Sequence, residues 1–184
     1  LRAAIASVYQ ATDRHDRCIE LLATPTARAE RAVATPLQQA ELAIIDSKCH
    51  FATDQRAAAW TLLDEAEQSL AGLHGAAADR LRAALLVERG EIRSFEGKLQ
   101  EANGYMEAVF ALGPYGDRRE HEFSANRQLA FNLFAAKDYP ASAERFQRAL
   151  ALGREVNGPT HRSTLTTAGG YAMVLERLGR APEA

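Results

Sequence analysis

The chain has 184 residues, which is enough for one or two domains with a sizeable core. A net charge of -2 gives no electrostatic basis for binding DNA, RNA or an anionic membrane, so we expect no nucleic-acid partner. No apolar run approaches the roughly 18 residues of a membrane-spanning helix, so we expect no membrane insertion by this segment. Hydrophobic residues make up 47%, and many of them are alanine, the strongest helix former.

Apolar residues at helical spacing predict a pair of helices at the start of the chain. Ile5 and Tyr9 share one face of the first helix, and Cys18 and Leu22 share one face of the second. The two cysteines of the chain, at 18 and 49, lack metal-binding spacing. They are interpreted either as small packed residues or, in an exported protein, as a disulfide. Residues 23–34 are interpreted as an extension or as a loop.

A helix start is encoded near residue 35. Thr35 is a typical N-cap, Pro36 suits the first helical position, and Gln38 completes a capping box. Asp54 is predicted to cap the partner helix. No single sequence offset aligns both helices with the later pairs, so we expect an insertion at their junction.

The clearest pair runs from Leu129 to Leu150, with Pro140 at the start of its second helix. Its pattern returns at Tyr171, an offset of 42 residues, and appears one copy earlier at an offset of 40. Small residues recur where helices would cross closely, and large residues recur where a neighbour would leave a hole. Since one pair cannot bury its apolar stripe alone, neighbouring pairs must stack.

The fold prediction is therefore an all-α array of antiparallel helix pairs in a single domain, 1–184. About four to five repeats are expected. Their approximate bounds are 1–34, 35–75, 76–116, 117–158 and a truncated 159–184. Because the chain begins at Leu1 and stops where a helix should begin, we expect a fragment of a longer protein.

These residues resemble the tetratricopeptide repeat family, whose pattern is matched best between Leu129 and Leu150. The matching residues are Leu129, Ala130, Leu133, Tyr139, Ser142, Phe146, Ala149 and Leu150. The resemblance implies a right-handed α-solenoid. The period exceeds the usual ~34 residues of that family, which is similar to the long subtype of kinesin light chains. Such arrays also occur in bacterial regulators, including the tails of serine/threonine kinases, so a bacterial signalling context is expected.

The sequence lacks the short motifs that are typical of catalytic, metal-binding and cofactor-binding sites. It contains no HExxH, GxSxG, P-loop or GxGxxG pattern, so we expect no enzyme, no catalytic residue, no cofactor and no metal site. Glu88 and Glu91 share a helix face, which is interpreted as solvated. Gly169 and Gly170 indicate close helix packing or, alternatively, a place where a ligand approaches the backbone.

The family resemblance implies that the first helix of each pair lines a concave groove. The expected partner-binding residues are Glu88, Glu91, Phe95, Arg127, Phe131, Phe134, Met173 and Arg177. Among them, Phe131 and Phe134 stand out, because large apolar side chains on a surface usually mark an interaction site. Alternatively, the two rings pack against a neighbouring loop or another repeat.

Two functions stay open. The first is a non-catalytic scaffold or interaction module that holds a peptide or helix in its groove, with self-association as a further option. The second is a small-molecule sensor attached to a kinase or transcription-factor effector. A deep pocket among Glu88, Glu91 and Arg127 would favour the sensor. A long shallow groove floored by Phe131, Phe134 and Met173 would favour a protein partner. A cytoplasmic and a periplasmic location both stay open.

Overall fold

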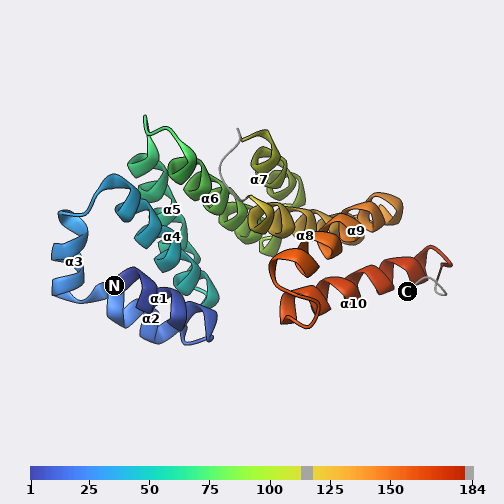
Figure 1. Cartoon of the computed structure of the whole chain (residues 1–184), viewed down its shortest axis with the longest axis horizontal. Coiled ribbons are helices and arrows are strands. Elements are labelled where there is room, and N and C mark those ends of the chain that lie inside the picture. The colour runs from blue at the N-terminus through green and yellow to red at the C-terminus, as the bar shows by residue number, and fades with distance from the viewer. Residues whose placement is uncertain (113–117, 181–184) are drawn as a thin grey trace. The chain divides into compact units, whose positions relative to one another are not determined.

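The computed structural model describes residues 1–112 and 118–180, and its regular structure there is entirely α-helical. The bounds of the helices are α1 Arg2–Ala11, α2 His15–Ala23, α3 Pro25–Ala32, α4 Pro36–Ala52, α5 Arg56–Leu70, α6 Ala76–Phe95, α7 Leu99–Ala111, α8 Arg119–Ala135, α9 Tyr139–Val156 and α10 Arg162–Arg177 (Figure 1). None of the helices in these ranges has the length and apolar character to cross a membrane. The all-α prediction is confirmed.

The chain divides into two compact units, Leu1–Ile92 and Arg93–Ala184. The first unit holds α1 to α5 and most of α6, and the second holds the end of α6 together with α7 to α10. The division into five repeats stays a prediction. Ala184, the last expected repeat marker, lies outside the described residues.

Four helix pairs share the same short junction. Three residues join the two helices, and the middle one has a left-handed backbone with φ of 56° at Asp13, 61° at Asp54, 76° at Gly97 and 63° at Lys137. Gly179, after α10, has a φ of 71°. These five residues follow one another at intervals of 41, 43, 40 and 42 residues. The long period expected from the sequence is therefore a structural period.

Backbone hydrogen bonds explain why the junctions are alike. After α8, the N–H of Asp138 donates to the carbonyl oxygen of Leu133 at 2.9 Å. The N–H of Arg14 donates to the carbonyl of Tyr9 at 2.8 Å in the same way. This six-to-one bond is the Schellman C-cap, which requires a left-handed residue just past the helix end.

The expected insertion between α4 and α5 is wrong. Their junction, residues 53–55, has the common length, and the extra element is instead the separate helix α3, which lies before the pair. Asp54 was also predicted to cap α5. It does not, because it holds the left-handed position and Gln55 is the N-cap residue. The predicted capping box of Thr35 and Gln38 is confirmed.

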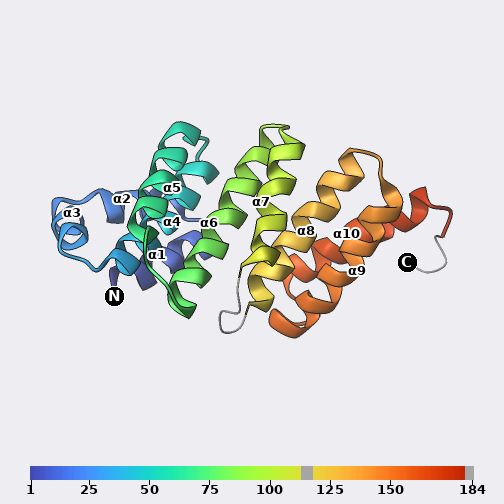
Figure 2. The same cartoon turned by 90° about the horizontal axis from the view of Figure 1, so that it is seen from above.

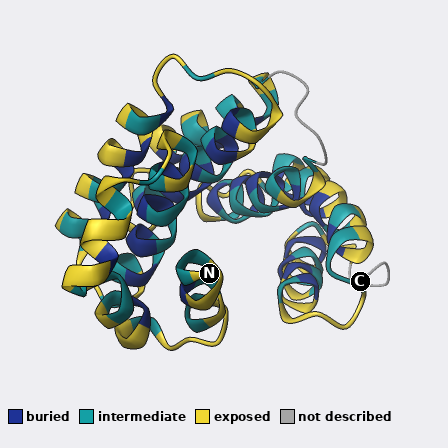
Figure 3. Cartoon of the chain, turned by 60° about the vertical axis from the view of Figure 1, so that its left-hand side comes forward, coloured by how far each residue is buried: buried dark blue, intermediate teal, exposed yellow. Residues whose placement is uncertain are grey.

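Helix packing in each unit buries residues on the facing sides of the helices (Figure 3). Five residues past the left-handed position of each of the four junctions stands a small, fully buried residue: Cys18, Ala59, Ala102 and Ser142. Small side chains at these positions let the two helices of a pair come close. In unit 1, α4 lies beside α5, and in unit 2, α9 lies beside both α8 and α10 (Figure 2).

Gly170 of α10 lies at a close approach between helices in unit 2. A Cβ atom at Gly170 would lie 2.6 Å from Cζ of the buried Phe146 and 3.1 Å from a ring atom of Phe131. Its neighbour Gly169 has no such atom within 4 Å. Gly170 therefore serves helix packing, the first of the two roles expected from the sequence.

Candidate functional site

The expected groove residues of unit 2 differ in how far they are exposed. Met173 on α10 is 51% exposed, and Arg177 on the same helix is exposed as well. Arg127 on α8 is half-buried, with its guanidinium carbon 5.8 Å from the ring centre of Phe123. Met173 and Arg177 are thus the accessible members on α10.

Phe131 and Phe134 are half-buried and contribute to the core of unit 2. Phe131 meets Phe146 edge to face, with ring centres 4.9 Å apart, and Phe134 lies 5.5 Å from the ring of Tyr139. Both rings pack against a cluster that includes the buried Ala130 and Phe146. Each phenylalanine therefore has a structural role in addition to any contact with a partner.

Glu88 on α6 is buried, at 2% exposure, so the expectation of a solvated face is wrong for this residue. One carboxylate oxygen lies 3.9 Å from Nζ of Lys48 on α4. Burial raises the pKa of Glu88 to about 8, opposed by the positive charge of Lys48 and reinforced by the negative charge of Glu91. A carboxyl group in this state is protonated at neutral pH.

Glu91 and Phe95, the two remaining expected residues, both lie on α6. Glu91, one turn after Glu88 on α6, is half-buried, whereas Phe95 at the end of that helix is 66% exposed. Glu88 and Glu91 belong to unit 1, and Phe95 and the residues of α8 and α10 belong to unit 2. The structure does not gather all eight predicted residues into one unit.

A polar network in unit 2 was not anticipated from the sequence. The buried side-chain amide of Asn132 donates to Oδ1 of Asn103 at 2.8 Å, and its oxygen accepts from Nε2 of Gln128 at 3.1 Å. Ser94 donates to the same oxygen and accepts from Gln128 at 2.7 Å. These bonds satisfy a buried amide and join α8 to α7, a structural role.

Unit 1 contains two adjoining clefts that flank α3. One has a volume of about 450 Å³ and is lined by residues of α2, α3, α4 and α5; the other has a volume of about 710 Å³ and is lined by residues of α3, α4 and α5 and of the chain just beyond α5. We call the first the α2–α5 cleft. Arg28, Arg31 and Glu65 line both clefts, so these three residues stand where the two meet. None of Glu88, Glu91 or Arg127 lines either cleft.

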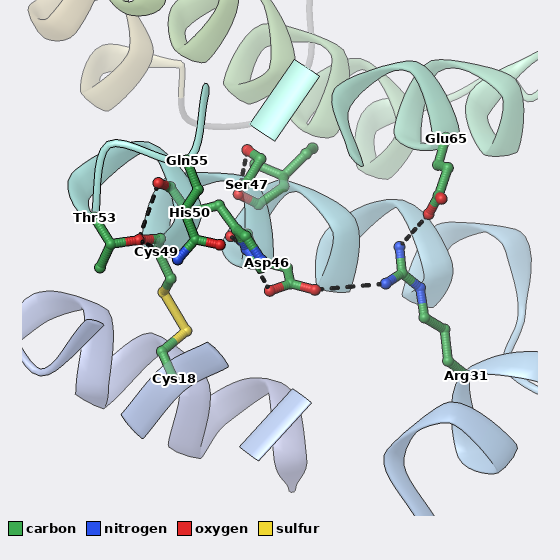
Figure 4. A network of polar contacts seen from close by, with 10 residues as sticks. Cys18, Arg31, Asp46, Ser47, Cys49, His50, Thr53, Gln55 and Glu65 are labelled. Carbon is green, nitrogen blue, oxygen red and sulfur yellow. Dashed lines mark hydrogen bonds and ion pairs between the residues drawn. A yellow bond between two sulfur atoms is a disulfide. The ribbon is translucent and has the colours of Figure 1, made fainter. Parts of the chain in front are cut away.

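Asp46 and His50 form the α4 wall of the α2–α5 cleft (Figure 4). His50 Nδ1 lies 3.0 Å from the backbone oxygen of Asp46 and 3.2 Å from its Oδ1. A backbone oxygen only accepts, so Nδ1 of His50 is the donor in this contact. Burial raises the pKa of Asp46, against the opposing charges of His50 and Arg31.

Arg31 on α3 contacts acidic side chains of both α4 and α5. Its guanidinium donates to Glu65 on α5 at 2.9 Å and lies 3.7 Å from Oδ2 of Asp46 on α4 (Figure 4). Gln39 donates to the backbone oxygen of Arg31 at 3.1 Å. These contacts hold α3 against α4 and α5, so they fix the helix that separates the two clefts.

Cys18 of α2 is disulfide-bonded to Cys49 of α4, directly beside His50 (Figure 4). Of the two alternatives left open by the sequence, the structure has the disulfide. The bond covalently joins the first helix pair to the second. Two walls of the α2–α5 cleft are therefore tied together next to its polar residues.

The sequence did contain a signal for this cleft. When the left-handed residues Asp54 and Lys137 are superposed, Asp46 takes the place of Leu129 and His50 that of Leu133. Polar residues thus stand where the fourth pair has its apolar stripe. At these two positions the second pair departs from the apolar pattern of the fourth pair.

The fold places the protein in a class: its described helices form the antiparallel helix pairs of an all-α fold that is like that of tetratricopeptide repeats. The family model described as tetratricopeptide repeat matches residues 121–184, and this match supports a tetratricopeptide repeat family. Repeats of this family generally mediate protein–protein interaction or scaffolding and are typically non-catalytic. A search of the curated proteins finds no match to this sequence. Across the described residues, no group of three or more His, Cys, Asp or Glu side chains is arranged to hold a metal ion.

Proposed function

We propose that the chain is a non-catalytic interaction module of a larger, bacterial regulatory protein of the kinesin-light-chain-like subtype. In this proposal a peptide or a helix of the partner lies against the first helices of the pairs. The observation that carries it is the tetratricopeptide repeat match over residues 121–184, which includes almost all of α8 and the whole of α10. No residue is assigned a catalytic role.

Exposed residues on α10 support this role. Met173 stands at the position in its pair that Phe131 holds on α8, 42 residues earlier. Phe131 is partly covered by Phe146, whereas Met173 is 51% exposed. An exposed methionine offers a flexible apolar contact that adapts to different partners. Beside it, Arg177 offers a charge for which no ion pair is seen among the described residues.

A peptide-display selection on the full chain tests the proposal, because it requires no partner to be identified first. Selected peptides are expected to lose at least about tenfold in affinity when Met173→Ser or Arg177→Glu is introduced. Arg154→Glu is the matched control, because Arg154 is an exposed arginine on α9, the second helix of its pair. Binding that Arg154→Glu weakens as much as Arg177→Glu would contradict this role. Sedimentation of the free chain over a range of concentrations tests self-association.

A small-molecule sensor is the second candidate function. The observation that favours it is the α2–α5 cleft, which has a size suited to a small ligand and polar groups on several walls. It lies in unit 1 and does not involve the residues of α8 and α10.

A further inference from the structure

The α2–α5 cleft contains hydrogen-bonding capacity that the fold leaves unused. Its volume of about 450 Å³ lies within the range of ~300–1,000 Å³ that is usual for small-molecule sites. Apolar side chains of Ile19, Leu22 and Leu62 line it together with Asp46 and His50. An apolar wall with a few placed polar groups is the usual composition of such a site.

Asp46 provides an acceptor without a donor. The residue is 8% exposed, and its Oδ1 is buried and receives no hydrogen bond among the described residues. His50 Nδ1 is close, but its single proton serves the backbone oxygen of Asp46 at 3.0 Å. A buried carboxylate oxygen with unused acceptor capacity is unfavourable, so a donor supplied by a ligand would be stabilising.

Arg28 provides a cation without a partner. It is exposed on α3, and no ion pair or hydrogen bond of its guanidinium occurs among the described residues. Arg31, one turn later, differs because Glu65 and Asp46 already hold it. The guanidinium of Arg28 is therefore available to bind a carboxylate.

Charges of both signs line the cleft, and they restrict the ligand. A plain organic anion would be attracted by Arg28 but repelled by Asp46 and Glu65. An amine without a carboxylate would be attracted by Asp46 and Glu65 but repelled by Arg28. A small zwitterion satisfies both, with its carboxylate on Arg28, its ammonium near Asp46 and Glu65, and an apolar group against Leu22 and Leu62.

We propose that the α2–α5 cleft binds a free α-amino acid with an apolar side chain. The disulfide between Cys18 and Cys49 prepares the site, because Cys18 precedes Ile19 on the α2 wall and Cys49 precedes His50 on the α4 wall. Walls that are fixed before binding reduce the entropy cost of association. This inference rests on the second candidate function, the small-molecule sensor, and does not depend on the interaction role.

The test is an NMR titration of the oxidised chain, residues 1–184, with L-leucine up to roughly 20 mM, a range that detects millimolar affinity. The expected shifts fall on backbone amides around Ile19, Arg28, His50 and Thr61. Two analogues each remove one charge: 4-methylpentanoate has no ammonium, and 3-methylbutylamine has no carboxylate. Each is expected to bind at least about fivefold more weakly than L-leucine.

Variants locate the site. Arg28→Gln is expected to weaken L-leucine binding about tenfold, because it removes a charge-assisted hydrogen bond from an exposed residue and leaves the core untouched. Arg80→Gln, an exposed arginine on α6 outside the cleft, is the matched control and should bind as the unmodified chain does. The proposal is overturned by an absence of shifts, by shifts elsewhere, by equal affinity for all three compounds, or by equal losses in the two variants.

Discussion

The sulfur atoms of Cys18 and Cys49 are bonded to each other, and this bond joins α2 of the first helix pair to α4 of the second. The two residues are 31 positions apart in the sequence. In a stacked array each pair is stabilised mainly by its neighbours. The disulfide adds a covalent link to the contacts between these two neighbouring pairs.

Reduction of this bond is expected to destabilise unit 1 by about 3–4 kcal/mol, the chain-entropy value for a closed loop of this length. Urea denaturation with and without reductant measures the change. Trp60, the one tryptophan of the chain, lies on α5 and reports unit 1 by its fluorescence. The double variant Cys18→Ser, Cys49→Ser should match the reduced protein and should not respond to reductant. An identical urea midpoint in oxidised and reduced protein would contradict the prediction.

Gly170→Ala is expected to destabilise unit 2 by about 1–3 kcal/mol, the usual cost of overpacking a filled core. The new methyl group would lie 2.6 Å from the ring of Phe146, which is fully buried and has no room to move away. Thermal denaturation followed by circular dichroism measures the effect. Gly169→Ala is the adjacent control, since it meets no atom within 4 Å and should gain about 0.5–1 kcal/mol from helix propensity. Equal melting temperatures for the two variants would refute this account of the helix contact.

Glu88 is expected to make unit 1 less stable as the pH rises from about 4.5 to about 8. The ordinary pKa is 4.5, and burial raises the pKa of the folded carboxyl to about 8, so in this interval the folded state holds a proton that the unfolded state has released. The free energy of unfolding then falls by at most ~1.4 kcal/mol per pH unit and levels off above that range. Urea titrations at several pH values, read by Trp60 fluorescence, measure the slope.

Glu88→Gln should flatten this pH dependence and stabilise unit 1 at pH 8, because a neutral amide needs no proton to remain buried. Glu41→Gln on α4 is the matched control, since Glu41 forms no ion pair among the described residues. Its curve should run parallel to that of the unmodified chain. A Glu88→Gln variant with the original slope would show that another group causes the dependence.

Lys137→Gly is expected to stabilise unit 2 by about 1 kcal/mol. Lys137 has a φ of 63°, a left-handed conformation that costs a residue with a Cβ roughly 1–2 kcal/mol and costs glycine much less. Gly97→Ala, at the same position of the preceding pair, should destabilise by a similar amount. Urea denaturation followed by circular dichroism compares the two. The same sign for both changes would argue against a shared junction geometry.

Phe131→Ser is expected to destabilise unit 2 by about 3 kcal/mol, as truncation of a packed phenylalanine usually does. Its ring meets Phe146 at 4.9 Å and borders Gly170, so removing it opens a cavity in the cluster around α9. Chemical denaturation measures the loss. Met173→Ser, at the corresponding and more exposed position on α10, should change stability by less than about 0.5 kcal/mol. Met173 is therefore the better residue for testing partner binding.

The sequence by itself determined the local architecture. The apolar periodicity from Leu129 to Leu150 encodes two helices, and Thr35 with Gln38 encodes a helix start, because both signals depend on residues a few positions apart. The return of the pattern at Tyr171 revealed the long period. Each of these features follows from backbone geometry and from which side chains share a helix face.

Only the tertiary structure decided what each face meets. Spacing places Glu88 and Glu91 on one side of a helix, but burial of Glu88 beside Lys48 depends on the packing of α6 against α4. In the same way, the sequence shows Asp46 only as an interruption of the apolar pattern of its helix. Its contact with Arg31 of α3 is seen only in the tertiary structure. The pairing of Cys18 with Cys49 also required two stacked helix pairs. Contacts between residues far apart in the sequence depend on how helices stack, and periodicity within one helix does not encode that.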